Sequence, residues 1–157
     1  LGLGYGLELG LGLGYPNPNS KMWVRVRRPS SVFSGEGSCG LMFTADNNLI
    51  EAVSANIFIN TPAGWVTPSL DKAGVNGVMR KLLLEQIFAE LEIPVESRTI
   101  SDEELNDCTE IFICNSIRGL LPVLAVRGSS HEFNLNLAIG AETKMLQSCL
   151  RDNYVGF

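Results

Sequence analysis

The chain has 157 residues, and 45% of them are hydrophobic, which is enough apolar material for one domain with a buried core. Charged residues make up only 18%, and the formal net charge is −5. This composition argues against nucleic acid or an anionic membrane as a partner. The sequence contains no run of about 18 uncharged apolar residues that would predict a membrane-spanning helix. The first residues contain leucine and glycine but no basic segment, so we do not expect a signal peptide.

The first quarter of the chain differs in amino-acid composition and pattern from the rest. Residues 1–14 alternate between leucine and glycine almost without interruption. This period-two pattern imitates a strand, but glycine at every second place removes the packing partner and adds backbone entropy. A strand candidate at 22–27 and a Ser/Gly-rich stretch at 29–40 follow. We expect residues 1–40 to form a poorly ordered extension and residues 41–157 to form the domain.

Strands and helices alternate from residue 41 onward. Strand-like runs are broken by turns at 46–48 and 62–64. A helix is predicted from Val78 to about Glu92, because apolar residues recur on one face at i+4 spacing, and Pro94 ends it. Further elements are predicted as follows: strands at 95–100, 110–115 and 121–126, a short helix opened by a capping box at 101–104, and a helix at 142–152. The class is therefore α/β or α+β.

Four cysteines, at 39, 108, 114 and 149, are scattered without CxxC spacing or neighbouring histidines. This arrangement argues against a zinc site or a redox motif. We expect reduced thiols and no metal centre.

Glu51 interrupts an apolar strand, IEAVSANIFI. A carboxylate in such a strand costs free energy unless it is exposed or paired. Two interpretations remain open. Glu51 lies exposed at a strand end, or it meets a cation such as a protonated pyridine nitrogen.

A glycine-flanked turn, Gly74 to Gly77, runs directly into the predicted helix. Unpaired N–H groups and the helix dipole make such a helix start an anion site. Gly77 would let a phosphate approach the backbone, and the N–H groups of Val78 and Met79 would point at it. The alternative is an ordinary N-cap formed by Asn76.

Polar residues follow the strand EIFI in the segment Cys114 to Gly119. Ligand contacts in α/β proteins lie just beyond strand ends, so this segment is a third candidate, although a plain turn between strands explains it equally well.

Together the blocks IEAVSANIFI, TPSLDKAGVNGVMRK and EIFICNSIRGLLPV resemble the class IV aminotransferase family of pyridoxal-phosphate enzymes, most closely its 4-amino-4-deoxychorismate lyases. The resemblance covers about residues 40 to 126. It implies the C-terminal cofactor-binding domain of the D-amino-acid aminotransferase-like fold, without the family's N-terminal domain. It also implies a cytoplasmic protein that takes a small-molecule substrate, and a homodimer if the parent protein is complete.

The resemblance assigns a role to each candidate residue. Glu51 would partner the pyridinium nitrogen of pyridoxal 5'-phosphate, and Asn56 would help to fix the loop beside it. The remaining roles are phosphate binding by Gly77, Val78, Met79 and the Ser116 hydroxyl, and substrate contacts by Asn115, Ile117 and Arg118. Arg80 would not be needed for the phosphate and would pack or pair structurally.

The implied reaction converts aminodeoxychorismate to 4-aminobenzoate and pyruvate, a step of folate biosynthesis. Alternatives are a branched-chain or D-amino-acid aminotransferase of the same family, or a catalytically inactive fragment. None of the lysines, at 21, 72, 81 and 144, stands in the family's Schiff-base context. No catalytic residue is therefore assigned. The sequence leaves two alternatives open for the chain alone, an active enzyme and an inactive fragment.

Overall fold

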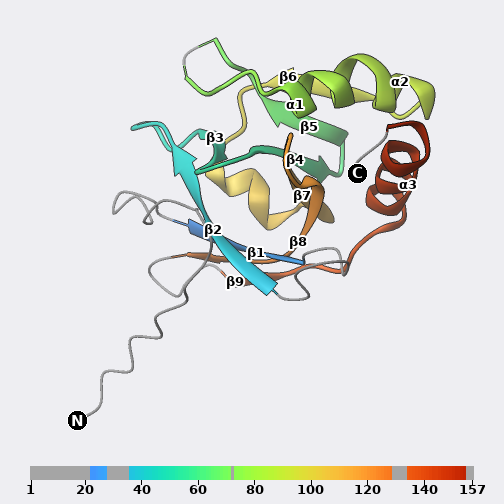
Figure 1. Cartoon of the computed structure of the whole chain (residues 1–157). Helices are drawn as coiled ribbons and strands as arrows, with labels where there is room; N and C mark the ends of the chain where they lie inside the picture. Colours follow the sequence, from blue (N-terminus) through green and yellow to red (C-terminus); the bar gives the residue numbers. More distant parts are fainter. Residues whose placement is uncertain (1–21, 28–35, 72, 129–133, 155–157) are drawn as a thin grey trace.

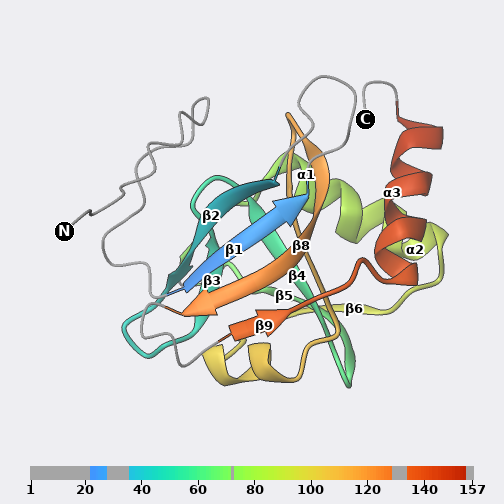
Figure 2. The ribbon, with the colours of Figure 1, turned by 90° about the horizontal axis from the view of Figure 1, so that it is seen from below.

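The computed structural model describes residues 22–27, 36–71, 73–128 and 134–154, and the Leu/Gly tract lies outside them. Within these residues, nine strands join in one sheet in the order β3-β2-β1-β8-β7-β4-β5-β6, and β9 pairs with β8 (Figures 1 and 2). The strands are β1 Met22–Arg27, β2 Glu36–Phe43, β3 Leu49–Ala52, β4 Asn56–Thr61, β5 Gly64–Pro68, β6 Val95–Arg98, β7 Glu110–Asn115, β8 Gly119–Gly128 and β9 Asn134–Asn136. The helical elements are α1 Val78–Leu82, η1 Leu83–Ile87, α2 Phe88–Glu90, η2 Asp102–Asn106 and α3 Ala141–Asn153.

The central strands bury both of their faces, because successive side chains point to opposite sides of a sheet. In β4, Ile57 and Ile59 enter one core, together with residues of β2, β3 and η2. Phe58, between them, enters a second core, where its ring stacks on Phe112 of β7 at a centroid distance of 4.9 Å. The helices α1, η1, α2 and α3 cover this second face. Because a core packs against each face of these strands, their sequences are continuous runs of apolar residues.

Every strand pair is antiparallel except β5 and β6, which are parallel. A parallel pair needs a crossover, and the continuous helical run 78–90 supplies it. The middle of this run, Leu83–Ile87, has π-type hydrogen bonding. The wider turn is compatible with the burial of both Ile87 and Phe88 against the sheet.

The two outer strands of the sheet approach one another, so that the sheet curves toward closure. The N–H of Leu49, at the start of β3, donates to the carbonyl of Ile100, just beyond β6, at 2.8 Å. The N–H of Asp102 donates to the carbonyl of Asn47 at 3.0 Å. This closure brings the β3–β4 turn close to the segment before α1, where the candidate site lies.

The sequence predicts most of these elements within a few residues. The strand at 22–27, the helix from Val78, and the strand at 110–115 are confirmed. The helix expected at 142–152 spans Ala141–Asn153. The expected domain boundary between residues 40 and 41 falls inside β2, and β1 lies in the interior of the sheet (Figure 2). Glycine and serine in β2 hide the alternation that would have indicated a strand there.

Candidate functional site

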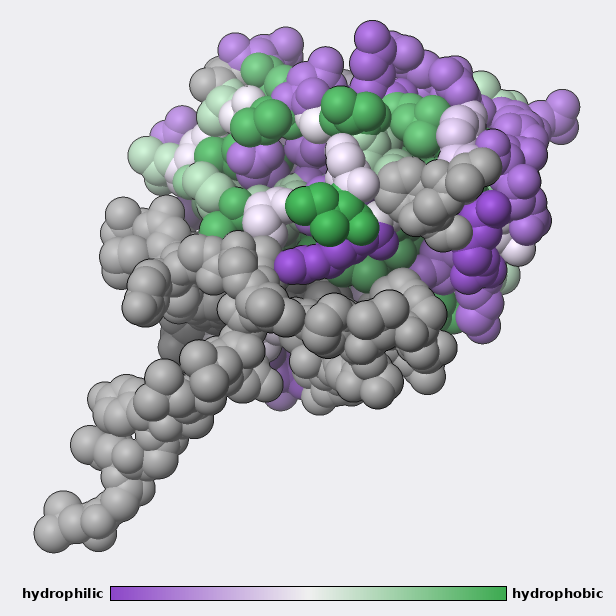
Figure 3. Space-filling model, viewed as in Figure 1, coloured by the Kyte–Doolittle hydropathy of each residue, from purple (hydrophilic) through white to green (hydrophobic). Residues whose placement is uncertain are grey.

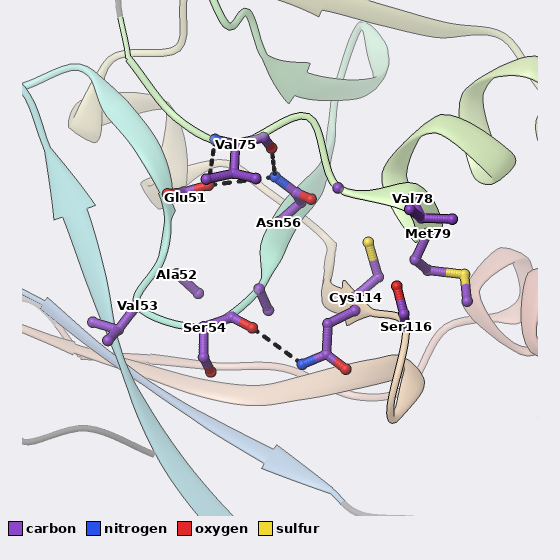
Figure 4. A pocket seen from close by; sticks show the side chains of 13 residues that line it. Glu51, Ala52, Val53, Ser54, Asn56, Val75, Val78, Met79, Cys114 and Ser116 are labelled. Carbon is purple, nitrogen blue, oxygen red and sulfur yellow. Dashed lines mark hydrogen bonds between the residues drawn. The ribbon is translucent and has the colours of Figure 1, made fainter. Parts of the chain in front are cut away.

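A cavity of about 270 Å³ lies where the β3–β4 turn, the start of α1 and the end of β7 meet (Figure 4). Seven of the nine site residues predicted from the sequence line it. They are Glu51, Asn56, Gly77, Val78, Met79, Asn115 and Ser116. The three blocks, which are far apart in the chain, therefore meet in one pocket.

The Glu51 carboxylate is held in place by two N–H donors. Its Oε2 accepts from the backbone N–H of Val75 at 3.1 Å and from the Asn56 amide at 3.4 Å (Figure 4). Asn56 also donates to the carbonyl of Val75 at 2.7 Å, and it is buried. Within the described residues, Glu51 forms no salt bridge, and its Oε1 accepts no hydrogen bond. The carboxylate is partly buried and positioned, with one oxygen left for a cationic group.

The helix that begins at Val78 has no side-chain cap. Its N-cap is Gly77, and no side-chain hydrogen bond is made there. Asn76, the alternative cap, instead accepts a hydrogen bond from Arg80 at 3.3 Å. The first N–H groups of a helix have no intrahelical acceptor, so those of Val78 and Met79 remain for an external anion.

Glycine is required at position 77 because a neighbouring side chain lies close to it, and not because of its backbone conformation. Its φ of −62° and ψ of 145° suit any residue. A Cβ at this position, however, would lie 2.3 Å from Oδ1 of the buried Asn56. The close approach of the backbone to Asn56 leaves room only for glycine, which keeps the helix start open to the pocket.

The N-terminus of α3 shows what a satisfied helix start looks like in this fold. The Glu110 carboxylate accepts from both the backbone N–H and the hydroxyl of Thr143. A Cβ on Gly140, the N-cap residue, would collide with this carboxylate. The carboxylate thus occupies at α3 the position that is open at Val78.

The end of β7 contributes Asn115, which has a structural role, and the turn after it contributes the hydroxyl of Ser116. The Asn115 side chain donates to the carbonyl of Ser54 at 3.1 Å and accepts from the N–H groups of Ile117 and Arg118 at 3.1 and 2.9 Å. This amide therefore ties the β7–β8 turn to the β3–β4 turn. The exposed Ser116 lines the pocket together with Val78 and Met79 at the start of α1 (Figure 4).

Ile117 and Arg118 do not line the pocket, although the sequence predicts substrate contacts for both. Ile117 is 89% exposed, because the turn directs its side chain outward. Val75 and Val78, at the pocket itself, are also largely exposed. Figure 3 shows that hydrophobic residues interrupt the polar surface on the face viewed in Figure 1.

Six residues that line the pocket were not predicted to take part, and they are Ala52, Val53, Ser54, Ala55, Val75 and Cys114. Ser54 and Val75 contribute backbone groups, which carry no residue-type signal. Burial raises the pKa of the Cys114 thiol far above its ordinary value, so it is a neutral wall of the pocket and no nucleophile.

Neither lysine of the described chain lines the pocket. Lys81 lies exposed on α1 beside Glu85, and Lys144 lies exposed on α3. Lys21 and Lys72 lie outside the described residues. Among the described residues, no helix is long and apolar enough to span a membrane.

Comparison with known proteins identifies the family. A family model described as amino-transferase class IV matches residues 37–126, more than half of the chain. The chain belongs to the class IV aminotransferase family. It is 36% identical in sequence to an aminodeoxychorismate lyase of Vibrio harveyi, over 66% of this chain and 37% of that protein. A probable branched-chain-amino-acid aminotransferase of Thermotoga maritima is 29% identical over 59% of this chain and 33% of that protein.

The solved structures agree with this assignment. The crystal structure of 4-amino-4-deoxychorismate lyase from Pseudomonas aeruginosa has a TM-score of 0.65 and 34% identity, over 74% of this chain and 40% of that one. The chain thus spans about two fifths or less of these relatives. Class IV aminotransferases depend on pyridoxal phosphate, and the mixed α/β sheet described above is their fold.

Proposed function

We propose that this class IV aminotransferase chain forms the cofactor-binding part of a 4-amino-4-deoxychorismate lyase, which converts aminodeoxychorismate to 4-aminobenzoate and pyruvate. The observation that carries the proposal is the pocket itself, where a positioned carboxylate and a helix start without a side-chain cap line the same cavity; among the described residues, one oxygen of this carboxylate accepts no hydrogen bond. Identities of 36% and 34% to lyases support the choice of reaction.

The residues of the pocket fit pyridoxal phosphate. Oε1 of Glu51 would hold a proton on the ring nitrogen, with Asn56 and the N–H of Val75 keeping the carboxylate in place through Oε2. The N–H groups of Val78 and Met79 would bind the phosphate, and Gly77 would permit its close approach. When bound, the cofactor supplies an electron-withdrawing ring that stabilises negative charge on the substrate.

Ser116 and Asn115 complete the proposed site in different ways. The Ser116 hydroxyl would donate to a phosphate bound at the start of α1, because it lines the same pocket. Asn115 would act by holding the two turns together, because its amide is already engaged with Ser54, Ile117 and Arg118. We propose no proton-abstracting base from the described residues, since neither Lys81 nor Lys144 lines the pocket.

A second candidate activity is transamination of branched-chain amino acids. The 29% identity to the Thermotoga maritima protein supports it, and the same pocket would hold the same cofactor. The two activities separate in a direct assay. Pyruvate formed from aminodeoxychorismate supports the lyase, whereas transfer of an amino group from leucine to 2-oxoglutarate supports the aminotransferase.

Borohydride reduction tests whether the chain attaches its own cofactor. Pyridoxal phosphate is added, the protein is reduced, and the modified lysine is mapped by peptide mass spectrometry. Labelling of one lysine, with release of pyruvate from aminodeoxychorismate, would support a complete site in this chain. Diffuse labelling of several lysines without turnover would refute lyase activity for the chain alone, and the cofactor-binding role would then rest on titration with pyridoxal phosphate.

A further inference from the structure

Arg80 belongs to the helix whose start forms the candidate phosphate site, and its side chain joins three segments of the chain. It is only 6% exposed, in the first turn of the helix. Its Nη1 donates to Asn76 Oδ1 at 3.3 Å, and its Nη2 donates to the Pro68 carbonyl at 3.0 Å and to Ser97 Oγ at 2.9 Å. The guanidinium thereby anchors the segment before α1 to the ends of β5 and β6.

All three acceptors are neutral, which is unusual for a buried cation. Among the described residues, Arg80 forms no salt bridge with a carboxylate. Burial lowers the pKa of Arg80, but a guanidinium remains charged in a protein. Arg98, on β6, shows the usual arrangement, because its charge is balanced by Glu104 at 2.7 Å.

The nearby thiol does not balance the charge of Arg80. The positive charge favours the thiolate of Cys114, yet burial raises the pKa of this thiol far above its ordinary range. Cys114 lines the pocket, so the field of Arg80 reaches the pocket wall. An anion at the helix start would experience the uncompensated charge and the helix dipole together.

We propose that Arg80 is a positioning residue of the phosphate site: it anchors the segment that opens the helix, and its unbalanced charge favours a phosphate dianion beside Gly77. This inference rests on the proposed cofactor site and assigns to Arg80 a role beyond packing. The phosphate need not touch the guanidinium, because the interaction acts through a wall of low polarity.

The test compares two ligands that differ only in the phosphate. Dissociation constants for pyridoxal 5'-phosphate and pyridoxal are measured by fluorescence titration of the full chain and of Arg80→Met and Arg80→Lys. We expect Arg80→Met to reduce the preference for the phosphorylated ligand about tenfold, and Arg80→Lys to retain most of it. If Arg80 had a purely structural role, its replacement would weaken the binding of both ligands equally. The ratio of the two dissociation constants would then stay unchanged.

Arg98→Met is the matched control, because it makes the same change of charge on a residue whose carboxylate partner balances it. Its ratio should equal that of the unaltered chain. Arg80→Gln, which keeps an amide donor, replaces Arg80→Met if circular dichroism shows that the methionine variant is unfolded. An unchanged ratio in the uncharged Arg80 variant would overturn the inference and leave the cofactor site standing. An unaltered chain without any preference for the phosphate would instead refute the proposed function.

Discussion

Substitution of Gly77 by alanine tests the geometry of the pocket most sharply. The added Cβ would lie 2.3 Å from Asn56 Oδ1, so the buried amide must move. Movement disrupts its hydrogen bonds to the Val75 carbonyl at 2.7 Å and to Glu51 at 3.4 Å. At about 1 kcal/mol for each bond, plus up to about 1 kcal/mol for alanine as an N-cap, the free energy of unfolding should fall by about 2–3 kcal/mol.

A double-mutant cycle with Asn56→Ala separates the collision from the other terms. Without the amide there is nothing to collide with, so Gly77→Ala in this background should cost less than about 1 kcal/mol. Urea denaturation followed by circular dichroism measures all four proteins. Equal costs of Gly77→Ala in the two backgrounds would refute the reasoning. The single variant should also bind pyridoxal phosphate more than about tenfold more weakly, because Glu51 loses its support.

Three further substitutions test separate parts of the site and of the fold. Glu51→Gln should weaken pyridoxal phosphate binding about tenfold with little change in melting temperature, since an amide still accepts from Val75; an unchanged dissociation constant would remove Glu51 from the site. Asn115→Asp keeps the turn acceptor but loses the donor to Ser54, so urea denaturation should show about 1–2 kcal/mol less stability, and equal stability would disprove the bridge. The hydrogen bond from Arg98 lowers the pKa of Glu104, so this pair stabilises the fold fully above pH 4.5 and progressively less as pH falls below it. Arg98→Met should therefore flatten the dependence of unfolding free energy on pH below 4.5, and an unaltered slope would contradict the assignment.

The sequence predicts the elements well because their signals are local. The i+4 spacing of Met79, Leu83 and Ile87 indicates a helix, and the structure places one there. The π-type hydrogen bonding of the same stretch is not predictable, because an α-helix has the same apolar spacing. The membership of β2 in the sheet was hidden by its glycines and serine, although pairing with β1 stabilises it there.

The site is predictable in composition but only partly in geometry. Glu51, Asn56 and Gly77 carry residue-type signals, and the fold brings them together. Contacts across long sequence separations leave no such signal. Asn115 bonds to a backbone carbonyl 61 residues away, so its role in joining two turns follows only from the structure. Ile117 faces outward and Arg118 does not line the pocket, so the substrate contacts predicted for both stay predictions.

The account depends most on the orientation of pyridoxal phosphate in the pocket, and a crystal structure of the chain with this ligand tests it most directly. We predict the phosphate within hydrogen-bond distance of the N–H groups of Val78 and Met79, and the ring nitrogen beside Glu51 Oε1. Density for the ligand in the reverse orientation, or at another surface, would contradict the assignment of both ends of the site.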